Sequence, residues 1–195
     1  FSKNDIVNEF YDKENYSYDE KLKMWKTKFD PENYKAKNFS EEVIDAKNNK
    51  TVVKQGEKIN FLTAKKLFNE GLKEIYVTNI SLYGKFLHKE VKCGNDIVVI
   101  GTEISETILN KLLENKIYSI EISKTNSINK GPYILQTLFN DKNESKNEAI
   151  TEIYKMLRPG EPPTLEIATQ IFNNLFFSSD RYDLSDVGRV KMNSR

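Results

Sequence analysis

Apolar residues at helical spacing predict two helices at the N-terminal end of the chain. One begins near Asp5, whose side chain can cap it, and the other covers residues 19–29. Their apolar faces contain Ile6, Val7 and Phe10 in the first helix and Leu22, Trp25 and Phe29 in the second.

Short β-prone runs separated by turn-forming residues predict two hairpins further along. The first joins strands at 43–46 and 51–53, and the second joins strands at 85–91 and 97–100. Their turns, 47–50 and 92–96, contain the Asn and Gly residues that favour a tight reversal of the chain.

The sequence also repeats itself at an offset of 45 residues, over 51–78 and 96–123. Each copy predicts a strand, a glycine turn, a helix and an exit strand, with the helices at 62–70 and 106–115. The simplest interpretation is two α+β units packed back to back, and a chance alignment of apolar residues is the alternative. The aligned residues are Gly56, Ile59, Leu67, Phe68, Leu72, Ile75 and Val77 in the first copy and Gly101, Ile104, Leu112, Leu113, Ile117, Ile120 and Ile122 in the second.

The C-terminal part predicts a polar connection over 124–146 and then helices. Asn147 can cap the first helix, which ends at Pro159-Gly160, and Thr164 can cap the second. A third helix starts at Asp183 or Ser185. The apolar stripes are Ala149, Ile150, Ile153, Tyr154 and Leu157 in the first helix and Ile167, Ile171, Phe172, Leu175 and Phe176 in the second.

Composition narrows the class of protein. The chain has 195 residues, 38% apolar and 30% charged, which is typical of a globular protein, and no apolar run approaches the roughly 20 residues that span a bilayer. The net charge of +1 means that a nucleic-acid contact needs a local basic patch. Because the chain begins at Phe1 and stops abruptly at Arg195, we expect it to be part of a longer protein.

Candidate chemistry is sparse. Cys93 and His88 are the only residues of their types, so they cannot form an intrachain disulfide or a structural zinc site. We expect His88 to be an exposed or hydrogen-bonded strand residue and Cys93 to be an unreactive turn residue. Phe172, Phe176 and Phe177 could stack on bases, but their helical spacing favours core packing.

A longer signature lies near the C-terminus. The run 152–164, which contains Arg158-Pro159-Gly160-Glu161-Pro162-Pro163-Thr164, closely resembles the β subunit of bacterial RNA polymerase, as do 175–177, 181–185 and 187–193. Gly131-Pro132-Tyr133-Ile134 and the opening helix are similar to the same family. The middle of the chain resembles, more weakly, an insertion found in the lobe of this subunit.

The resemblance implies a division of an α+β fold. Residues 1–15 would flank the lobe, 16–145 would form the lobe insertion with its internal repeat (51–78 and 96–123), and 146–195 would form lobe helices. In the family the lobe lines the downstream DNA channel, and its insertions project outward and can dock transcription factors. A protein-docking module without direct DNA contact is the alternative function.

The resemblance also implies what the chain lacks. The parent enzyme is a DNA-directed RNA polymerase, a nucleotidyltransferase, whose catalytic magnesium is bound by the β′ subunit, so this segment is expected to hold no cofactor and no catalytic residue. Implied partners are the α, β′, ω and sigma subunits and DNA, in the cytoplasm at the nucleoid.

Arginine and lysine are the side chains that contact phosphates. Arg158, Arg189 and Lys191 are therefore the DNA-binding candidates. Arg158 could instead tie down the Pro-Gly turn through Glu161, Arg181 could pair with Asp183, and Arg189 and Lys191 could lie on a solvated helix face. Arg195 adds a further positive charge.

Overall fold

The computed structural model describes residues 2–34, 37–38, 42–54, 56–126, 130–180 and 185–194. The chain divides into two compact units, Phe1–Asn140 and Asp141–Arg195. The first combines helices with a largely antiparallel sheet and the second is helical, so the predicted α+β class is confirmed. The division into lobe and insertion stays a prediction.

The first unit contains eleven strands and four α-helices among its described residues. Its helices are α1 (Lys3–Phe10), α2 (Phe61–Asn69), α3 (Glu106–Glu114) and α4 (Tyr133–Asn140), with short 3₁₀ helices η1 (Pro31–Tyr34) and η2 (Asn79–Leu82). Its strands are β1 (Lys13–Asp19), β2 (Met24–Lys28), β3 (Lys37–Asn38), β4 (Val43–Asp45), β5 (Thr51–Val53), β6 (Lys58–Ile59), β7 (Glu74–Val77), β8 (Phe86–Leu87), β9 (Val91–Cys93), β10 (Asp96–Val98) and β11 (Ser119–Ser123).

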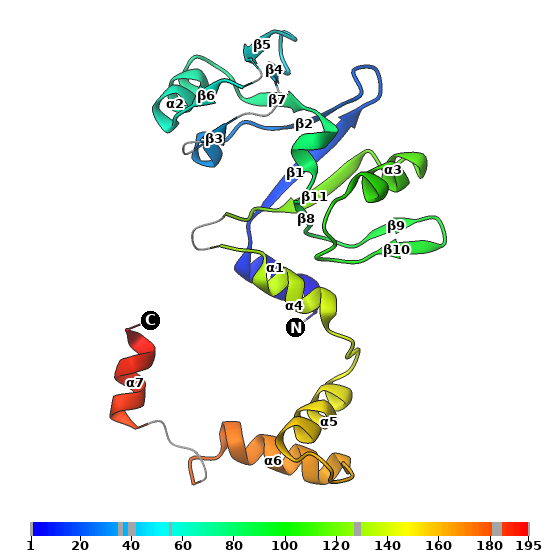
Figure 1. Cartoon of the computed structure of the whole chain (residues 1–195), viewed down its shortest axis with the longest axis vertical. Helices are drawn as coiled ribbons and strands as arrows, with labels where there is room; N and C mark the ends of the chain where they lie inside the picture. The colour runs from blue at the N-terminus through cyan, green and yellow to red at the C-terminus, as the bar shows by residue number, and fades with distance from the viewer. Residues whose placement is uncertain are drawn as a thin grey trace. The chain divides into compact units, whose positions relative to one another are not determined.

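One seven-stranded sheet, in the order β5-β4-β7-β2-β1-β11-β8, organises the first unit (Figure 1). The β1–β2 hairpin lies at its centre, with β7 paired to β2 and β11 paired to β1. The two exit strands of the sequence repeat therefore flank a hairpin that precedes both copies in the chain.

The 45-residue offset recurs in the local structure. Helices α2 and α3 begin and end at equivalent positions, and Asn60 and Ser105 cap them by accepting hydrogen bonds from the backbone N–H three residues on. Gly56 and Gly101 have φ of +79° and +77°, the left-handed region that glycine adopts readily. The cap, the helix and the exit strand thus form twice, but the entry strands differ: β5 lies in the seven-stranded sheet, whereas β10 pairs with β9 outside it.

The two copies lie side by side on one sheet, so the expectation of back-to-back packing was wrong. Tyr16 pairs across the strands with Thr27 and Ile120, and Thr27 pairs with Ile75, so these side chains share one face. Ile75 packs in a core with α2, and Ile120 packs in a core with α3. Both helices therefore cover the same face.

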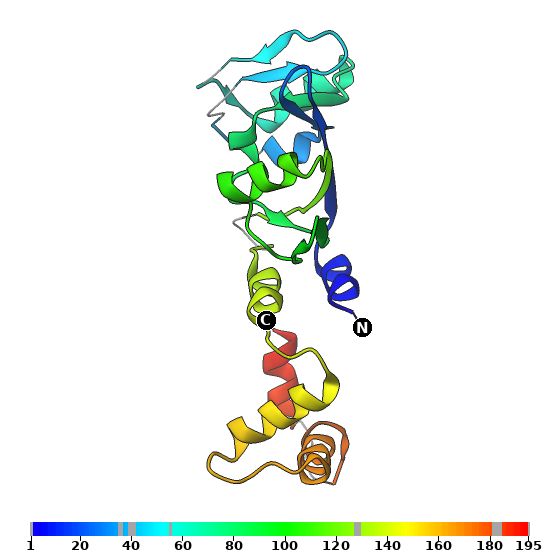
Figure 2. The same ribbon diagram turned by 90° about the vertical axis from the view of Figure 1, so that its right-hand side faces the viewer.

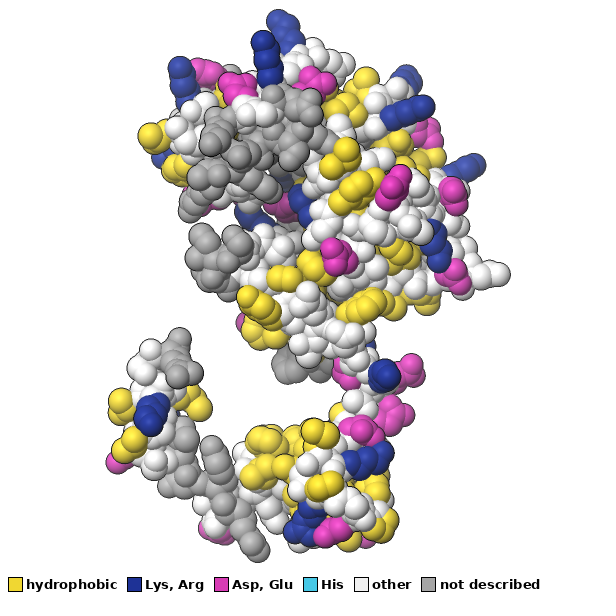
Figure 3. All heavy atoms as spheres, in the orientation of Figure 1, with side chains coloured by type: hydrophobic (Ala, Val, Ile, Leu, Met, Phe, Trp, Pro, Cys, Tyr) yellow, Lys and Arg dark blue, Asp and Glu magenta, His cyan; other side chains and the backbone are white. Residues whose placement is uncertain are grey.

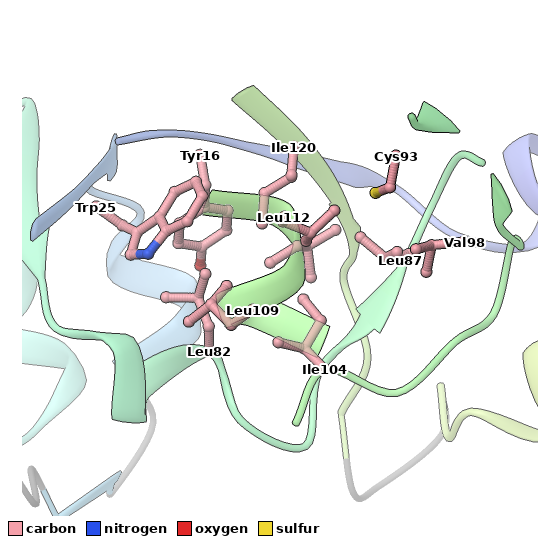
Figure 4. Close-up of a cluster of buried hydrophobic side chains, with 11 residues drawn as sticks. Tyr16, Trp25, Leu82, Leu87, Cys93, Val98, Ile104, Leu109, Leu112 and Ile120 are labelled. Atoms are coloured by element: carbon pink, nitrogen blue, oxygen red, sulfur yellow. The ribbon is translucent and has the colours of Figure 1, made fainter. Parts of the chain in front are cut away.

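Two hydrophobic cores form beneath these helices. The larger, drawn in Figure 4, contains Tyr16, Trp25, Leu82, Leu87, Cys93, Val98, Ile104, Leu109, Leu112, Ile120 and Ile122. The smaller contains Phe29, Val43, Val53, Ile59, Ala64, Leu72 and Ile75. Val77 packs against both, which joins the two cores.

The helix predicted over 19–29 is wrong, because this segment is the β1–β2 turn followed by β2. The Asp19 carboxylate accepts from the backbone N–H groups of Lys21 and Leu22, and Lys23 adopts a φ of +53°. From there Trp25 and Thr27 are buried at period two. Trp25 is fully buried by strands and helices that are distant in sequence, and this tertiary packing selects the strand.

The hairpin predicted first is confirmed as β4–β5, while the second differs from its prediction. Its strands are β9 and β10, closed by the two residues Gly94 and Asn95. Residues 86–87 instead form β8 in the main sheet. Cys93, expected in the turn, is a buried strand residue of the larger core, where it acts as a small apolar side chain.

A helix, α4, occupies part of the connection expected over 124–146. Its Leu135 is fully buried in a third core with Val7, Tyr11, Phe86 and Ile100. Figures 1 and 2 show α4 beside α1. The N-cap of α1 is Ser2, and the predicted cap Asp5 is the N3 residue, whose carboxylate accepts a hydrogen bond from the Ser2 backbone N–H.

The second unit contains α5 (Lys146–Leu157), α6 (Leu165–Phe177) and α7 (Asp186–Asn193). Ser145 caps α5 in place of the predicted Asn147, with Glu148 completing a capping box. Thr164 holds the N-cap position of α6, but its side chain makes no capping hydrogen bond. Ser185 caps α7, which confirms one of the two predicted starts of this helix. The other, Asp183, lies outside the described residues.

Helices α5 and α6 pack around a small core. Its buried residues are Ile150, Tyr154 and Ala168, with Ile171 and Phe172 packed against them. Phe176 and Phe177 were expected in the core but are 56% and 76% exposed, although both rings contact Phe172. A pair of helices has too little inward-facing surface to bury all three rings.

His88 is buried at the junction of α1, β8 and β11. Its Nδ1 lies 3.0 Å from Ser123 Oγ and its Nε2 lies 2.9 Å from Asn8 Oδ1. Both ring nitrogens have partners, so the expectation of a hydrogen-bonded histidine is confirmed. Burial lowers the pKa of His88 below its usual 6.5, with smaller opposing effects from Glu121 and Asp12.

The first prediction compares two glycines with the same backbone conformation. A Cβ at position 101 would lie 2.6 Å from the Leu135 carbonyl oxygen, whereas one at position 56 would meet nothing within 4 Å. Both alanine variants incur the left-handed strain of about 1–2 kcal/mol, and G101A adds an overpacking cost of about 1–3 kcal/mol. Urea unfolding of G101A and G56A should show the larger destabilisation for G101A; equal destabilisation would contradict this packing.

The second prediction concerns pH. His88 is protonated at about pH 6.5 in the unfolded chain but only at lower pH in the folded chain. The contribution of His88 to the free energy of unfolding is therefore fully present above pH 6.5 and decreases as the pH falls below it. For this one group the slope cannot exceed about 1.4 kcal/mol per pH unit. Urea unfolding between pH 7 and 5.5 measures it. H88Q should flatten that part of the profile; an unchanged slope would assign it to other groups.

Candidate nucleic-acid interface

The turn after α5 positions the first basic candidate. Arg158 is the C-cap residue, and its backbone N–H donates to the Tyr154 carbonyl oxygen at 2.8 Å. Pro159 cannot continue the helix, and Gly160 takes a φ of +91°, so the chain reverses sharply here. The predicted end of the helix at Pro159-Gly160 is confirmed.

A three-residue network fixes the side chains of this turn. Glu161 Oε2 accepts a hydrogen bond from the Tyr154 hydroxyl at 2.8 Å and one from Arg158 Nη1 at 3.3 Å. Tyr154 is buried in the α5–α6 core, so the network connects that core to the surface. The sequence alternative in which Arg158 pairs with Glu161 is the arrangement that the structure has.

The electrostatics of the network follow from these contacts. The hydrogen bond to the Glu161 carboxylate raises the pKa of Tyr154, with burial as the second cause. The same bond, followed by the one from Arg158, lowers the pKa of Glu161. The Glu161 side chain that pairs with Arg158 therefore stays ionised to lower pH than an ordinary glutamate. Its side chain is still 53% exposed, and a guanidinium has five N–H donors, so it can also donate outward.

The other two candidates lie on α7. Arg189 and Lys191 are both exposed. Residues two apart on a helix point about 200° apart, so these two side chains leave α7 on nearly opposite sides. Among the residues that the structure describes, no hydrogen bond or ion pair joins Arg189 or Lys191 to the Arg158 turn. Arg181, its expected partner Asp183, and Arg195 lie outside the described residues.

Sequence reasoning missed how much apolar surface the second unit exposes. Figure 3 shows hydrophobic side chains at the surface of the α5–α6 pair. The exposed ones on these two helices are Met156, Leu157, Leu165, Ile167, Phe176 and Phe177. Ile167 and Leu157 had been assigned to buried stripes, and their exposure could not be read from the helical period, which fixes a face but not its partner.

One surface depression in this unit is lined by α6 alone. It has a volume of about 600 Å³ and is lined by Leu165, Glu166, Thr169, Gln170, Asn173 and Asn174. Its single charged residue is acidic, which does not favour phosphate. In the described part of the chain, no group of three His, Cys, Asp or Glu side chains is arranged to bind a metal. No helix there is long and apolar enough to cross a membrane.

Comparison with known proteins identifies the family. The family model described as RNA polymerase Rpb2, domain 2 matches residues 109–195. The chain is 39% identical over 197 residues to the DNA-directed RNA polymerase subunit beta of Rickettsia felis, covering 100% of the chain and 14% of that relative. It is 39% identical over 194 residues to the subunit of the same name from Rhizobium leguminosarum bv. trifolii, covering 98% of the chain and 14% of the relative.

The chain therefore spans only a small part of the curated relatives that it matches. The alignment nevertheless runs through both units, including the repeat, so the likeness is not confined to the motif around Arg158. On this evidence, the chain belongs to the β-subunit family of bacterial DNA-directed RNA polymerases and corresponds to one segment of that subunit.

Proposed function

We propose that this segment contributes to DNA-templated transcription as a wall of the downstream DNA channel, with an outer surface available for docking. The observation that carries the proposal is the identity of 39% to bacterial β subunits along the whole chain. The segment supplies positioning and electrostatic contact. Arg158, Arg189 and Lys191 are its proposed DNA-contacting residues.

The chemistry belongs to the assembled enzyme. The parent would carry out template-directed nucleotidyl transfer, with its catalytic magnesium on the β′ subunit and with the α, ω and sigma subunits as further partners. It would work in the cytoplasm, at the nucleoid. Within this arrangement the segment needs no catalytic residue, because its role is to hold the DNA duplex.

The strength of the proposed contacts suits a duplex that must move. Each phosphate neutralised by Lys or Arg contributes about 0.9 to the slope of log K against log salt. Two or three such contacts give weak binding without sequence preference. Arg158 contributes less than a free arginine, because Glu161 already occupies part of its guanidinium.

A docking role for the insertion is the second candidate, and the β9–β10 hairpin favours it. Ile97 and Val99, in and just after β10, are 54% and 45% exposed, and β10 pairs only with β9 among the described strands. An open strand edge beside apolar side chains can accept a strand from a partner. Ile97→Lys should then weaken factor binding and leave basal transcription unchanged.

The third prediction tests the DNA contact in the assembled polymerase. Alanine variants of Arg189 and Lys191 should shorten the lifetime of the promoter open complex, most strongly at low salt and less as salt is raised. Because the two side chains leave α7 on opposite sides, the single variants should differ, with the DNA-facing one reducing the salt slope by about 0.9. K142A, an exposed lysine of the same unit, is the control; equal effects of all three variants would contradict a specific contact.

The fourth prediction concerns the Arg158 network. E161Q removes the carboxylate charge from Arg158 but keeps an oxygen that can accept the Tyr154 hydroxyl. If Arg158 faces DNA, E161Q should lengthen the lifetime of the open complex, and R158A/E161Q should abolish that increase. If E161Q and R158A/E161Q have the same lifetime, Arg158 only stabilises the turn.

A further inference from the structure

The two copies of the repeat share a scaffold but carry opposite charge. The first copy, 51–78, contains five lysines and three glutamates, whereas the second, 96–123, contains two lysines and five acidic residues. Helices, caps and turn glycines coincide at the 45-residue offset. The fold is thus served equally by both sets of surface residues, and it does not require the difference in charge.

One pair of equivalent lysines shows how the difference arises. In the second copy, Lys111 Nζ lies 2.7 Å from Asp96 Oδ2, and this contact lowers the pKa of Asp96. At the 45-residue offset Lys66 aligns with Lys111, and Thr51 aligns with Asp96. Among the described residues, Lys66 pairs with Glu70 at the longer distance of 3.9 Å, and both of these side chains are largely exposed. Lys111 is thus held by a closer carboxylate than Lys66 is.

Further lysines extend this charge around the first copy. Lys65 follows on the exposed side of α2, Lys47 and Lys50 lie in the β4–β5 turn, and Lys54 follows β5, all exposed. Among the residues that the structure describes, no carboxylate pairs with any of these four. Figure 3 shows Lys and Arg side chains projecting from the end of the unit that carries β4, β5 and α2.

The composition of this surface identifies the kind of partner. Protein interfaces are depleted in lysine and rely on a buried apolar centre. The exposed side of α2 has Leu62 as its large apolar residue, beside Lys65 and Lys66. Phosphate backbones, by contrast, bind through dispersed lysines that need no apolar centre. Charge complementarity therefore favours a nucleic-acid backbone over a protein.

We propose that Lys47, Lys50, Lys54, Lys65 and Lys66 form a lysine surface that contacts the phosphate backbone of duplex DNA. Lys54, Lys65 and Lys66 belong to the first copy of the repeat, and Lys47 and Lys50 precede it in the β4–β5 turn. These residues are different from those proposed to contact DNA in the second unit, Arg158, Arg189 and Lys191. The second copy, with its excess of acidic residues, lacks this binding.

The fifth prediction tests the lysine surface with the whole chain and a fluorescent DNA duplex, by anisotropy over a range of salt. K65Q/K66Q should reduce the slope of log K against log salt by about 0.9 for each phosphate that is no longer neutralised. K89Q/K92Q removes two exposed lysines next to and within β9, beside the second copy, and is the matched control. It should leave the slope unchanged, although the net charge changes equally.

A variant of the other part of the lysine surface gives a second measurement. K47Q/K50Q removes the two exposed lysines of the β4–β5 turn and should also reduce the slope. Circular dichroism checks that each variant is folded. The proposal is overturned if the chain does not bind the duplex at low salt, if K65Q/K66Q leaves the slope unchanged, or if K89Q/K92Q reduces it equally.

The chain with R189A and K191A separates this proposal from the previous one. If that variant reduces the slope and K65Q/K66Q does not, the C-terminal contact stands and the lysine surface is excluded. If K65Q/K66Q reduces it and the α7 variant does not, the reverse holds. Reductions in both, adding when combined, are expected if the two surfaces bind independently.

Discussion

Burial of the β1–β2 hairpin between the two copies is the constraint on which the first unit depends. Trp25, fully buried, faces Val77 of the first copy across the strands, and Tyr16 faces Ile120 of the second. Tyr16 and Trp25 of the hairpin pack in the core under the second copy, and Phe29, directly after β2, packs in the core under the first. The hairpin precedes both copies in the chain, so the sheet closes only through contacts between residues about 50 to 100 positions apart, which is slow to fold but fixes a single register.

Elements whose structure depends on interactions between neighbouring residues were predicted correctly from the sequence. Helix α3 was predicted at 106–115 and spans Glu106–Glu114, because Ser105 and the apolar spacing act within the helix itself. The segment 19–29 was mispredicted because Leu22, Trp25 and Phe29 fit a helical period, while the strand is selected by Tyr16 and Val77 across the sheet. Helix α4 was missed although Ile134, Leu135 and Leu138 have helical spacing, since it is short and its flanks are polar.

The candidate site was predictable in its residues but not in its geometry. The sequence offered two roles for Arg158, and only the folded turn shows Glu161 shared between Arg158 and the buried Tyr154. For Arg189 and Lys191, spacing on α7 already implied opposite directions, a consequence of helical geometry that follows once the helix is established. The opposite charge of the two copies can be read from the sequence. Its positions can be compared only once the structure shows that the helices and caps of the two copies are equivalent.

A net charge of +1 limits how such a segment can act on DNA. It produces no long-range field, and at physiological salt interactions between exposed charges fade beyond about 8 Å, so attraction must come from groups that approach the phosphates closely. Lys47, Lys50, Lys54 and Lys65, which have no carboxylate partner among the described residues, meet this condition better than Lys111, whose ion pair with Asp96 is close. Whether a basic residue attracts DNA is therefore decided by its nearest carboxylate more than by the total charge of the chain. The two copies keep equivalent caps and helices while Asp96 of one aligns with Thr51 of the other, so this difference in surface charge makes no demand on the core.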